Sequence, residues 1–189
     1  TGATVTASPT ITTTYTATAQ TTGGCFTTDT VLVIVNPIPN VGLVPGSVIQ
    51  CAGVNVNLNA SGASTYSWGP SAGLSATTGS SVTASPYVNT TYTVIGTDNN
   101  GCKDSAFSQI TAYPLPPINA GNDITVCHTP IQVTLGGFTP QGGTWSGTGI
   151  VDPVNAVFDP MVSGLGTFTL FYDVINANGC TNHDSIHVT

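Results

Sequence analysis

The stretch TTYTVIGTDNNGC, residues 90–102, decides the fold of this chain. Its first part alternates the apolar residues Tyr92 and Val94 with threonine, and this period of two is typical of a half-buried β-strand. Asn99-Asn100-Gly101 then carries the signal of a tight turn, and a cysteine follows it directly. The stretch therefore predicts a strand that ends in a hairpin turn with a cysteine beside it.

The same pattern occurs three times along the chain at a nearly constant distance. Thr14-Tyr15-Thr16 and Gly24-Cys25 precede their counterparts by 77 residues, and Asn178-Gly179-Cys180 follows its counterpart by 78. The opening TGATVTASP, residues 1–9, likewise matches TGSSVTASP, residues 78–86. A period of this length is too long for a solenoid unit and suits a small domain.

The repeats predict a longer array of domains, of which this sequence is one part. The predicted segments are the C-terminal half of a repeat over residues 1–37 and two complete repeats over residues 38–114 and 115–189. The first segment has no counterpart of Cys51 or Trp68. Its missing strands are therefore expected to lie upstream or to come from another chain, because an isolated half would leave strand edges unpaired.

The rest of each repeat predicts short strands with frequent turns. VNVNLN, residues 54–59, alternates strictly, and no window of the chain has the helical period. Short alternating strands separated by turn signals are typical of antiparallel β-sandwiches. Two proline-rich joints, residues 36–39 and 113–117, mark the boundaries and predict short, stiff linkers.

The charge of the chain limits its partners. Only 5% of the residues are charged, the formal net charge is −7, and Lys103 is the one basic residue. Nucleic acids and anionic membrane surfaces are excluded as partners, because nothing in the chain can neutralise their phosphates. No apolar run reaches the roughly 18 residues that a membrane span needs, so no membrane insertion is expected.

Five cysteines permit several pairings, and the repeat adds a constraint. Cys51 and Cys127 share one repeat position and Cys102 and Cys180 another, so each complete repeat allows one internal pair. We therefore predict the disulfides Cys51–Cys102 and Cys127–Cys180, with Cys25 bonded to a cysteine outside the chain. Closing a loop of about 50 residues stabilises a domain by about 4 kcal/mol, and disulfides indicate an oxidising, extracellular setting. The alternative is five free buried thiols.

Two tryptophans also share a repeat position. Trp68 and Trp145 are 77 residues apart, and each lies in a predicted strand. Such a residue serves either as a core side chain or as an exposed platform on which a sugar ring stacks. The core interpretation is favoured for both.

No set of residues predicts catalysis or metal binding. A catalytic site needs a nucleophile, a base and a group that orients them, and the chain offers no such combination. His183 and His187 would lie about 13 Å apart on one face of a strand, too far for one metal ion. We therefore expect no enzyme, no catalytic residue, no metal and no cofactor.

The repeat sequence resembles a known family. Cys51 with the following VNVNLNASG, TYSWGPSAGL and TTYTVIGTDNNGC resembles the immunoglobulin-like, PKD-like repeats of giant secreted proteins of Bacteroidetes, and GTFTLFYDVINANGC resembles a sister repeat. The resemblance implies an all-β fold of tandem immunoglobulin-like antiparallel β-sandwiches. It also implies surface adhesins, gliding-motility filaments or stalks that the type IX secretion system exports to the cell surface. The WDFGDG-like turn of PKD domains proper is absent, so no calcium site is implied.

The resemblance also points to O-glycosylation, since Bacteroidetes modify the hydroxyl of the tripeptide Asp-Ser/Thr-apolar. One such tripeptide follows the second cysteine of each repeat, and the expected sites are Thr30, Ser105 and Ser185. Ser185 would share the outer face of its strand with His187. The alternative is that the Asp and the hydroxyl only cap a turn or a strand end.

The leading hypothesis for function is a structural or adhesive segment of a stalk or filament on a bacterial surface. Its partners would be neighbouring repeats of the same or an adjacent chain. The alternative is a glycan- or ligand-binding sandwich accessory to a secreted enzyme, which would take surface glycans as partners. Buried rings of Trp68 and Trp145 would favour the stalk, and an exposed row of rings would favour glycan binding.

Overall fold

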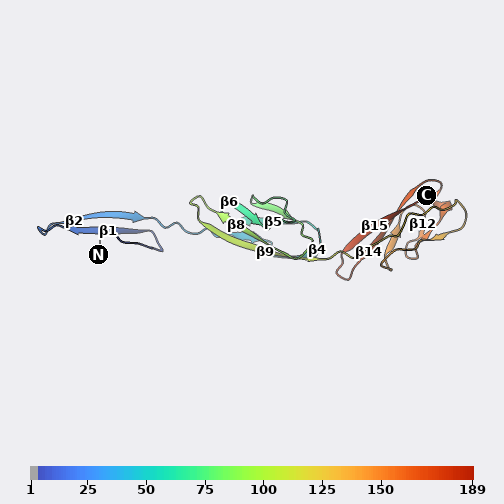
Figure 1. Cartoon of the computed structure of the whole chain (residues 1–189), viewed down its shortest axis with the longest axis horizontal. Helices are drawn as coiled ribbons and strands as arrows, with labels where there is room; N and C mark the ends of the chain where they lie inside the picture. The colour runs from blue at the N-terminus through green and yellow to red at the C-terminus, as the bar shows by residue number, and fades with distance from the viewer. Residues whose placement is uncertain (1–3) are drawn as a thin grey trace. The chain divides into compact units, whose positions relative to one another are not determined.

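The computed structural model describes residues 4–189, which are almost entirely β-structure (Figure 1). The one helix in this range is the single turn α1, Pro160–Ser163. The chain forms two compact units. One holds the chain up to Gly46, Asn57–Thr83 and Tyr92–Ser108, and the other holds Ser47–Val56, Ala84–Thr91 and Gln109–Thr189.

Two strands near the N-terminus form a hairpin by themselves (Figure 1, blue). β1, Thr13–Gln20, pairs antiparallel with β2, Phe26–Val33, in an unbroken register from Thr13↔Val33 to Gln20↔Phe26. No residue of either strand is buried. Within residues 4–189, no further strand pairs with this hairpin.

Seven strands follow between residues 42 and 113, and they form two sheets. In chain order they are β3 Gly42–Val44, β4 Ser47–Cys51, β5 Val56–Ser61, β6 Thr65–Gly69, β7 Ser81–Ala84, β8 Thr90–Thr97 and β9 Lys103–Tyr113. One sheet has the order β3-β5-β7 and the other β4-β9-β8-β6. This is the layout of an immunoglobulin-like sandwich, with β3, β5 and β7 in the places of strands A, B and E and β6, β8 and β9 in those of C, F and G. β4 pairs in parallel with the end of β9, from Ser47↔Gln109 to Cys51↔Tyr113.

The inward faces of these strands are those that the alternation predicts. Leu58, Tyr92 and Val94 are fully buried, while Thr91 and Thr93, on either side of Tyr92, are exposed. Trp68 lies on β6 and is only 6% exposed, and its indole Nε1 donates a hydrogen bond to the carbonyl of Gly79 at 2.8 Å. Trp68 is therefore a core residue, as expected.

The last segment has shorter strands and the same two-sheet plan. In chain order they are β10 Val133–Thr134, β11 Thr144–Ser146, β12 Ile150–Asp152, β13 Val157–Phe158, β14 Phe168–Ile175 and β15 Thr181–Val188. One sheet has the order β10-β13-β12 and the other β11-β14-β15. A parallel bridge between Ile124 and Val188 corresponds to the pairing of β4 with β9.

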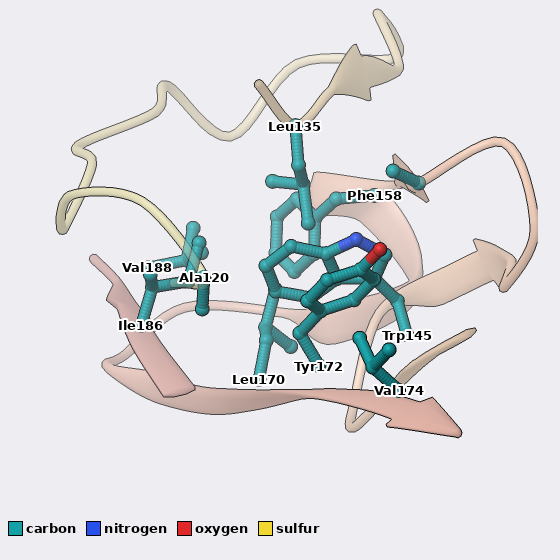
Figure 2. Close-up of a cluster of buried hydrophobic side chains, with 10 residues drawn as sticks. Ala120, Leu135, Trp145, Phe158, Leu170, Tyr172, Val174, Ile186 and Val188 are labelled. Carbon is teal, nitrogen blue, oxygen red and sulfur yellow. The ribbon is translucent and has the colours of Figure 1, made fainter. Parts of the chain in front are cut away.

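An aromatic cluster forms the core of this segment (Figure 2). Trp145 is 2% exposed, and its ring lies 5.0 Å from that of Tyr172 between centroids. Figure 2 shows both rings packed among Leu135, Phe158 and Leu170, which are buried as well. Trp145 is thus also a core residue, as expected.

All strands of each sheet come from one of the three predicted segments, within residues 13–33, 42–113 or 133–188. The two compact units follow other bounds, since Ser47–Val56 and Ala84–Thr91 belong with the C-terminal unit. The fold is thus all-β and immunoglobulin-like, and the division into repeats stays a prediction.

Candidate functional site

The most distinctive feature of the molecule is its disulfide, Cys51–Cys180, which joins residues 129 positions apart and has a Cα–Cα distance of 5.6 Å. Cys51 is the last residue of β4, and Cys180 lies in the turn between β14 and β15. Both cysteines belong to the same compact unit. The predicted pairs Cys51–Cys102 and Cys127–Cys180 are therefore wrong: the bond links cysteines of two different predicted repeats.

The length of the strands explains why the bond within a repeat does not form. Cys51 lies opposite Tyr113 at the end of β9, whereas Cys102 comes just before Lys103 at its start. An extended strand rises about 3.3 Å per residue, so the eleven steps from Cys102 to Tyr113 cover about 36 Å. A disulfide needs Cα atoms within about 7 Å of each other. The two cysteines are therefore at opposite ends of the strand.

The same reason applies to the second predicted pair. The backbone N–H of Val126 donates to the carbonyl of Thr189, which places Cys127 beside the end of β15. Cys180 comes just before the start of that strand at Thr181. The nine steps from Cys180 to Thr189 cover about 30 Å by the same rise per residue.

Asparagine side chains support the disulfide at the proline-rich joint. Asn176 Nδ2 donates to the carbonyl of Pro114 at 2.9 Å, and Asn182 Nδ2 donates to that of Pro116 at 3.0 Å. Pro116 and Cys180 are buried. We call this set the junction: Cys51, residues 113–116, and the turn of residues 176–182.

The junction combines covalent and polar links, and its large loop makes the disulfide strongly stabilising. In the chain-entropy model, a loop of this length is worth about 5 kcal/mol against unfolding. Asn176 and Asn182 are not among the residues that the repeat pattern predicts to be functional. The signal for them is the asparagine-rich stretch NANGCTN, residues 176–182, which brackets the bonded cysteine.

Three cysteines within residues 4–189 are free thiols in the structure. Cys25 and Cys127 are exposed, and Cys102 is half-buried. Cys25 is at the end of the β1–β2 turn, where the N–H of Thr21 donates to its carbonyl at 2.9 Å. The alternative of five free thiols is wrong as well, because two of the five are bonded.

Aspartates near the turn cysteines hold the backbone that enters each sandwich. Asp104 Oδ2 accepts a hydrogen bond from the N–H of Val41 at 3.1 Å, and Asp184 Oδ2 accepts one from Ala120 at 2.8 Å. The bond from the backbone of Ala120, and then that from Ser185, lower the pKa of Asp184 from its ordinary value. The two aspartates thus have a structural role in the fold. This role favours the alternative in which the Asp-Ser tripeptides cap backbone groups instead of marking glycosylation sites.

The hydrogen bond from Ala120 to the carboxylate of Asp184 makes the stability of residues 115–189 depend on pH. A carboxyl group whose pKa is lower in the folded state stabilises the fold above its unfolded pKa of about 3.9, and this contribution is lost as the pH falls through the folded pKa. We expect the melting temperature to fall between pH 5 and pH 2, and to fall less in Asp184→Asn, whose amide oxygen still accepts from Ala120. Calorimetry across this range measures it. Asp173→Asn, at an exposed position on β14, is the matched control, and an identical acid profile in both variants would contradict the assignment.

The three expected glycosylation residues differ in exposure. Thr30 and Ser105 are exposed, and Ser185 is half-buried between Asp184 and the buried Ile186. His187 is exposed on the same strand, and its Nδ1 lies 3.5 Å from Asp123 Oδ1. All three hydroxyl-bearing side chains therefore lie outside the fully buried core.

An open groove of about 1020 Å³ runs along one face of the N-terminal hairpin. It is lined by residues 5–8, by Tyr15–Thr18 of β1 and by β2 residues between Asp29 and Val33. The residues 77 positions after its six apolar residues are all buried: Val82, Ala84, Tyr92, Val94, Ser108 and Ile110. By this offset in sequence, the face that lines the groove corresponds to the inward faces of β7, β8 and β9.

Among residues 4–189, no group of three or more His, Cys, Asp or Glu side chains is arranged to hold a metal ion. In the same range, no helix has both the length and the apolar character required to span a bilayer.

No family model and no curated protein matches this chain. Solved structures of similar shape include the insect immune protein hemolin, with 13% identity, a TM-score of 0.39, and coverage of 93% of this chain and 55% of that one. Drosophila N-cadherin EC1-4 has 8% identity, a TM-score of 0.34, and coverage of 94% and 57%. The N-terminal eight Ig domains of Down Syndrome Cell Adhesion Molecule have 14% identity, a TM-score of 0.33, and coverage of 93% and 27%. The chain spans about half the length of the first two, and TM-scores below 0.5 identify no shared function.

Proposed function

We propose that this chain is a structural segment of an extracellular stalk or filament built from immunoglobulin-like repeats. The observation that carries the proposal is the Cys51–Cys180 bond, which joins two predicted repeats. A bond within one domain would stabilise that domain alone. A bond across a joint would also hold neighbouring repeats together when the chain is pulled.

The chemistry of the chain supports an extracellular place for this segment. A structural disulfide forms and persists in oxidising compartments. The resemblance of the repeat sequence to those of giant secreted proteins of Bacteroidetes supports the bacterial surface and export by the type IX system. The alternative, a glycan- or ligand-binding module, is less well supported, because Trp68 and Trp145 are both buried and offer no exposed ring on which a sugar could stack.

We also propose that the N-terminal hairpin belongs to a repeat of the same kind as residues 38–114. Val5 and Val31 are 78% and 60% exposed, whereas Val82, the counterpart of Val5, is 3% exposed. Strands equivalent to β3, β5 and β6 would cover this face, and they would come from a neighbouring part of the polypeptide or from another chain.

Immunogold labelling of intact cells of the source organism tests the stalk. Antibodies raised against residues 38–189 are expected to label extended material outside the cell envelope. Pre-absorption of the antibodies with the purified chain is the control. Label confined to the cytoplasm would contradict the proposal.

O-glycosylation at Thr30, Ser105 and Ser185 is part of this proposal. Glycans on exposed hydroxyl groups would hydrate a surface with few charges and hinder association of strand edges. The intact mass of the chain purified from its native source is expected to exceed that of the polypeptide, and Asp104→Ala is expected to remove the glycan at Ser105. A mass equal to that of the bare polypeptide would contradict the prediction.

A further inference from the structure

We propose that Cys51–Cys180 is one member of a regular series of cross-links between repeats. In this series, the first cysteine of each repeat bonds the turn cysteine of the following repeat. Cys102 would then bond the first cysteine of a preceding repeat, and Cys127 the turn cysteine of a following repeat. The inference rests on the proposed array of repeats.

The turn around Cys102 is built like the turn around the bonded Cys180. Asp98 Oδ1 accepts from the N–H groups of Asn100 and Cys102 at 2.9 and 2.8 Å. Asn176 Oδ1 accepts from Asn178 and Cys180, both at 3.0 Å. Each turn holds its cysteine through the same pair of bonds, so Cys102 is presented to a partner as Cys180 is.

The glycine before each turn cysteine shows that the two turns have the same backbone conformation. Gly101 and Gly179 have φ angles of +82° and +80°. This left-handed conformation favours glycine, because it has no Cβ. The sequence Asn-Gly-Cys therefore specifies one turn conformation at both places.

Cys127 corresponds in the same way to the bonded Cys51. Cys51 ends a strand that runs parallel to the last residues of β9. Cys127 follows Val126, which pairs with Thr189 next to the parallel bridge Ile124↔Val188. Each cysteine thus lies beside the end of the final strand of its own sandwich, where a following repeat begins.

The geometry of each repeat leaves the turn cysteine no partner of its own. A strand length of about 36 Å by the usual rise per residue separates Cys102 from the position of Cys51. A partner for the half-buried Cys102 must therefore come from outside its own repeat. The bond forms when two thiols give up two protons and two electrons to a disulfide oxidant such as oxidised glutathione, which is reduced to two glutathione thiols.

The test places a preceding repeat in front of the full chain. A second copy of residues 38–77 is joined to Thr1, and it continues into TGATVTASP as the original continues into TGSSVTASP. The added copy carries its own counterpart of Cys51. Val54→Ile in that copy alone distinguishes its peptides by mass, and pepsin replaces trypsin because the chain has one basic residue.

After refolding in a glutathione buffer, free thiols are expected to fall from the three of the present chain to two, although one cysteine has been added. Peptide mapping is expected to find the added cysteine bonded to Cys102, with Cys51–Cys180 retained. In the matched variant with Cys102→Ser, the added cysteine is expected to stay a thiol.

Two results would overturn the series of cross-links and leave the array intact. The first is a bond from the added cysteine to Cys25. The second is an added cysteine that stays a free thiol although slowed hydrogen exchange at the Tyr15 amide shows that the new repeat has folded. A hairpin that remains as unprotected as in the present chain would overturn the proposed array as well, so the failures of the two proposals are distinguishable.

Discussion

Pulling the oxidised chain by its two ends is expected to extend only its terminal parts. Force passes from residue 1 to Cys51, across the sulfur atoms to Cys180, and on to Thr189, because the disulfide joins positions 129 residues apart. The residues between them bear no tension. An extended chain spans about 3.6 Å per residue, so breaking the bond should lengthen the fully stretched molecule by about 460 Å.

Optical tweezers measure this difference directly. The oxidised chain, with its free thiols alkylated first, is compared with Cys51→Ser, which is expected to show the additional length. Cys25→Ser removes a thiol that takes no part in the bond, and its force curve is expected to match that of the oxidised parent. Equal stretched lengths for the parent and Cys51→Ser would contradict the bond, and with it the observation that carries the proposed stalk.

Replacing Tyr92 by alanine is expected to destabilise the protein far more than replacing Tyr15, although the two tyrosines lie in the same short sequence. Tyr15 and Tyr92 both lie in Thr-Tyr-Thr, 77 residues apart. Tyr92 is fully buried, and its hydroxyl donates to the carbonyl of Ala72 at 2.7 Å, whereas Tyr15 is only half-buried beside the open groove. Tyr92→Ala should cost about 3–5 kcal/mol, as large core truncations do, and Tyr15→Ala less than about 1 kcal/mol.

Hydrogen exchange over β6 and β8 tests this contrast, because Tyr92 lies on β8 and β6 pairs with that strand. A loss of about 3 kcal/mol raises exchange through global opening by about 10²-fold, since 1.4 kcal/mol is a factor of ten. Tyr15→Ala is the matched control and should leave exchange in these strands unchanged. Similar exchange in both variants would contradict the expected difference between the buried Tyr92 and the half-buried Tyr15.

Local sequence was sufficient for the strands and the faces they bury. The side chains of a strand alternate between its two faces, so the threonines around Tyr92 and Val94 predict which residues are buried without knowledge of the neighbouring strand. Asn-Gly-Cys predicts the turn for the same local reason, because a positive φ at its glycine depends on the residue itself. Trp68 and Trp145 were also correctly assigned to the core.

Only the tertiary structure decided which cysteines bond to each other and which inward-facing side chains are covered by a second sheet. The repeat identified Cys51 with Cys127 and Cys102 with Cys180, but alternation carries no information on which end of a sandwich a strand end reaches. That depends on β4 running parallel to β9, a pairing between segments some 60 residues apart, as Ser47↔Gln109 shows. The burial of Tyr92 and the exposure around Tyr15 differ for a related reason. A side chain on an inward face is buried only where a second sheet lies opposite, and that sheet is supplied by residues distant in sequence.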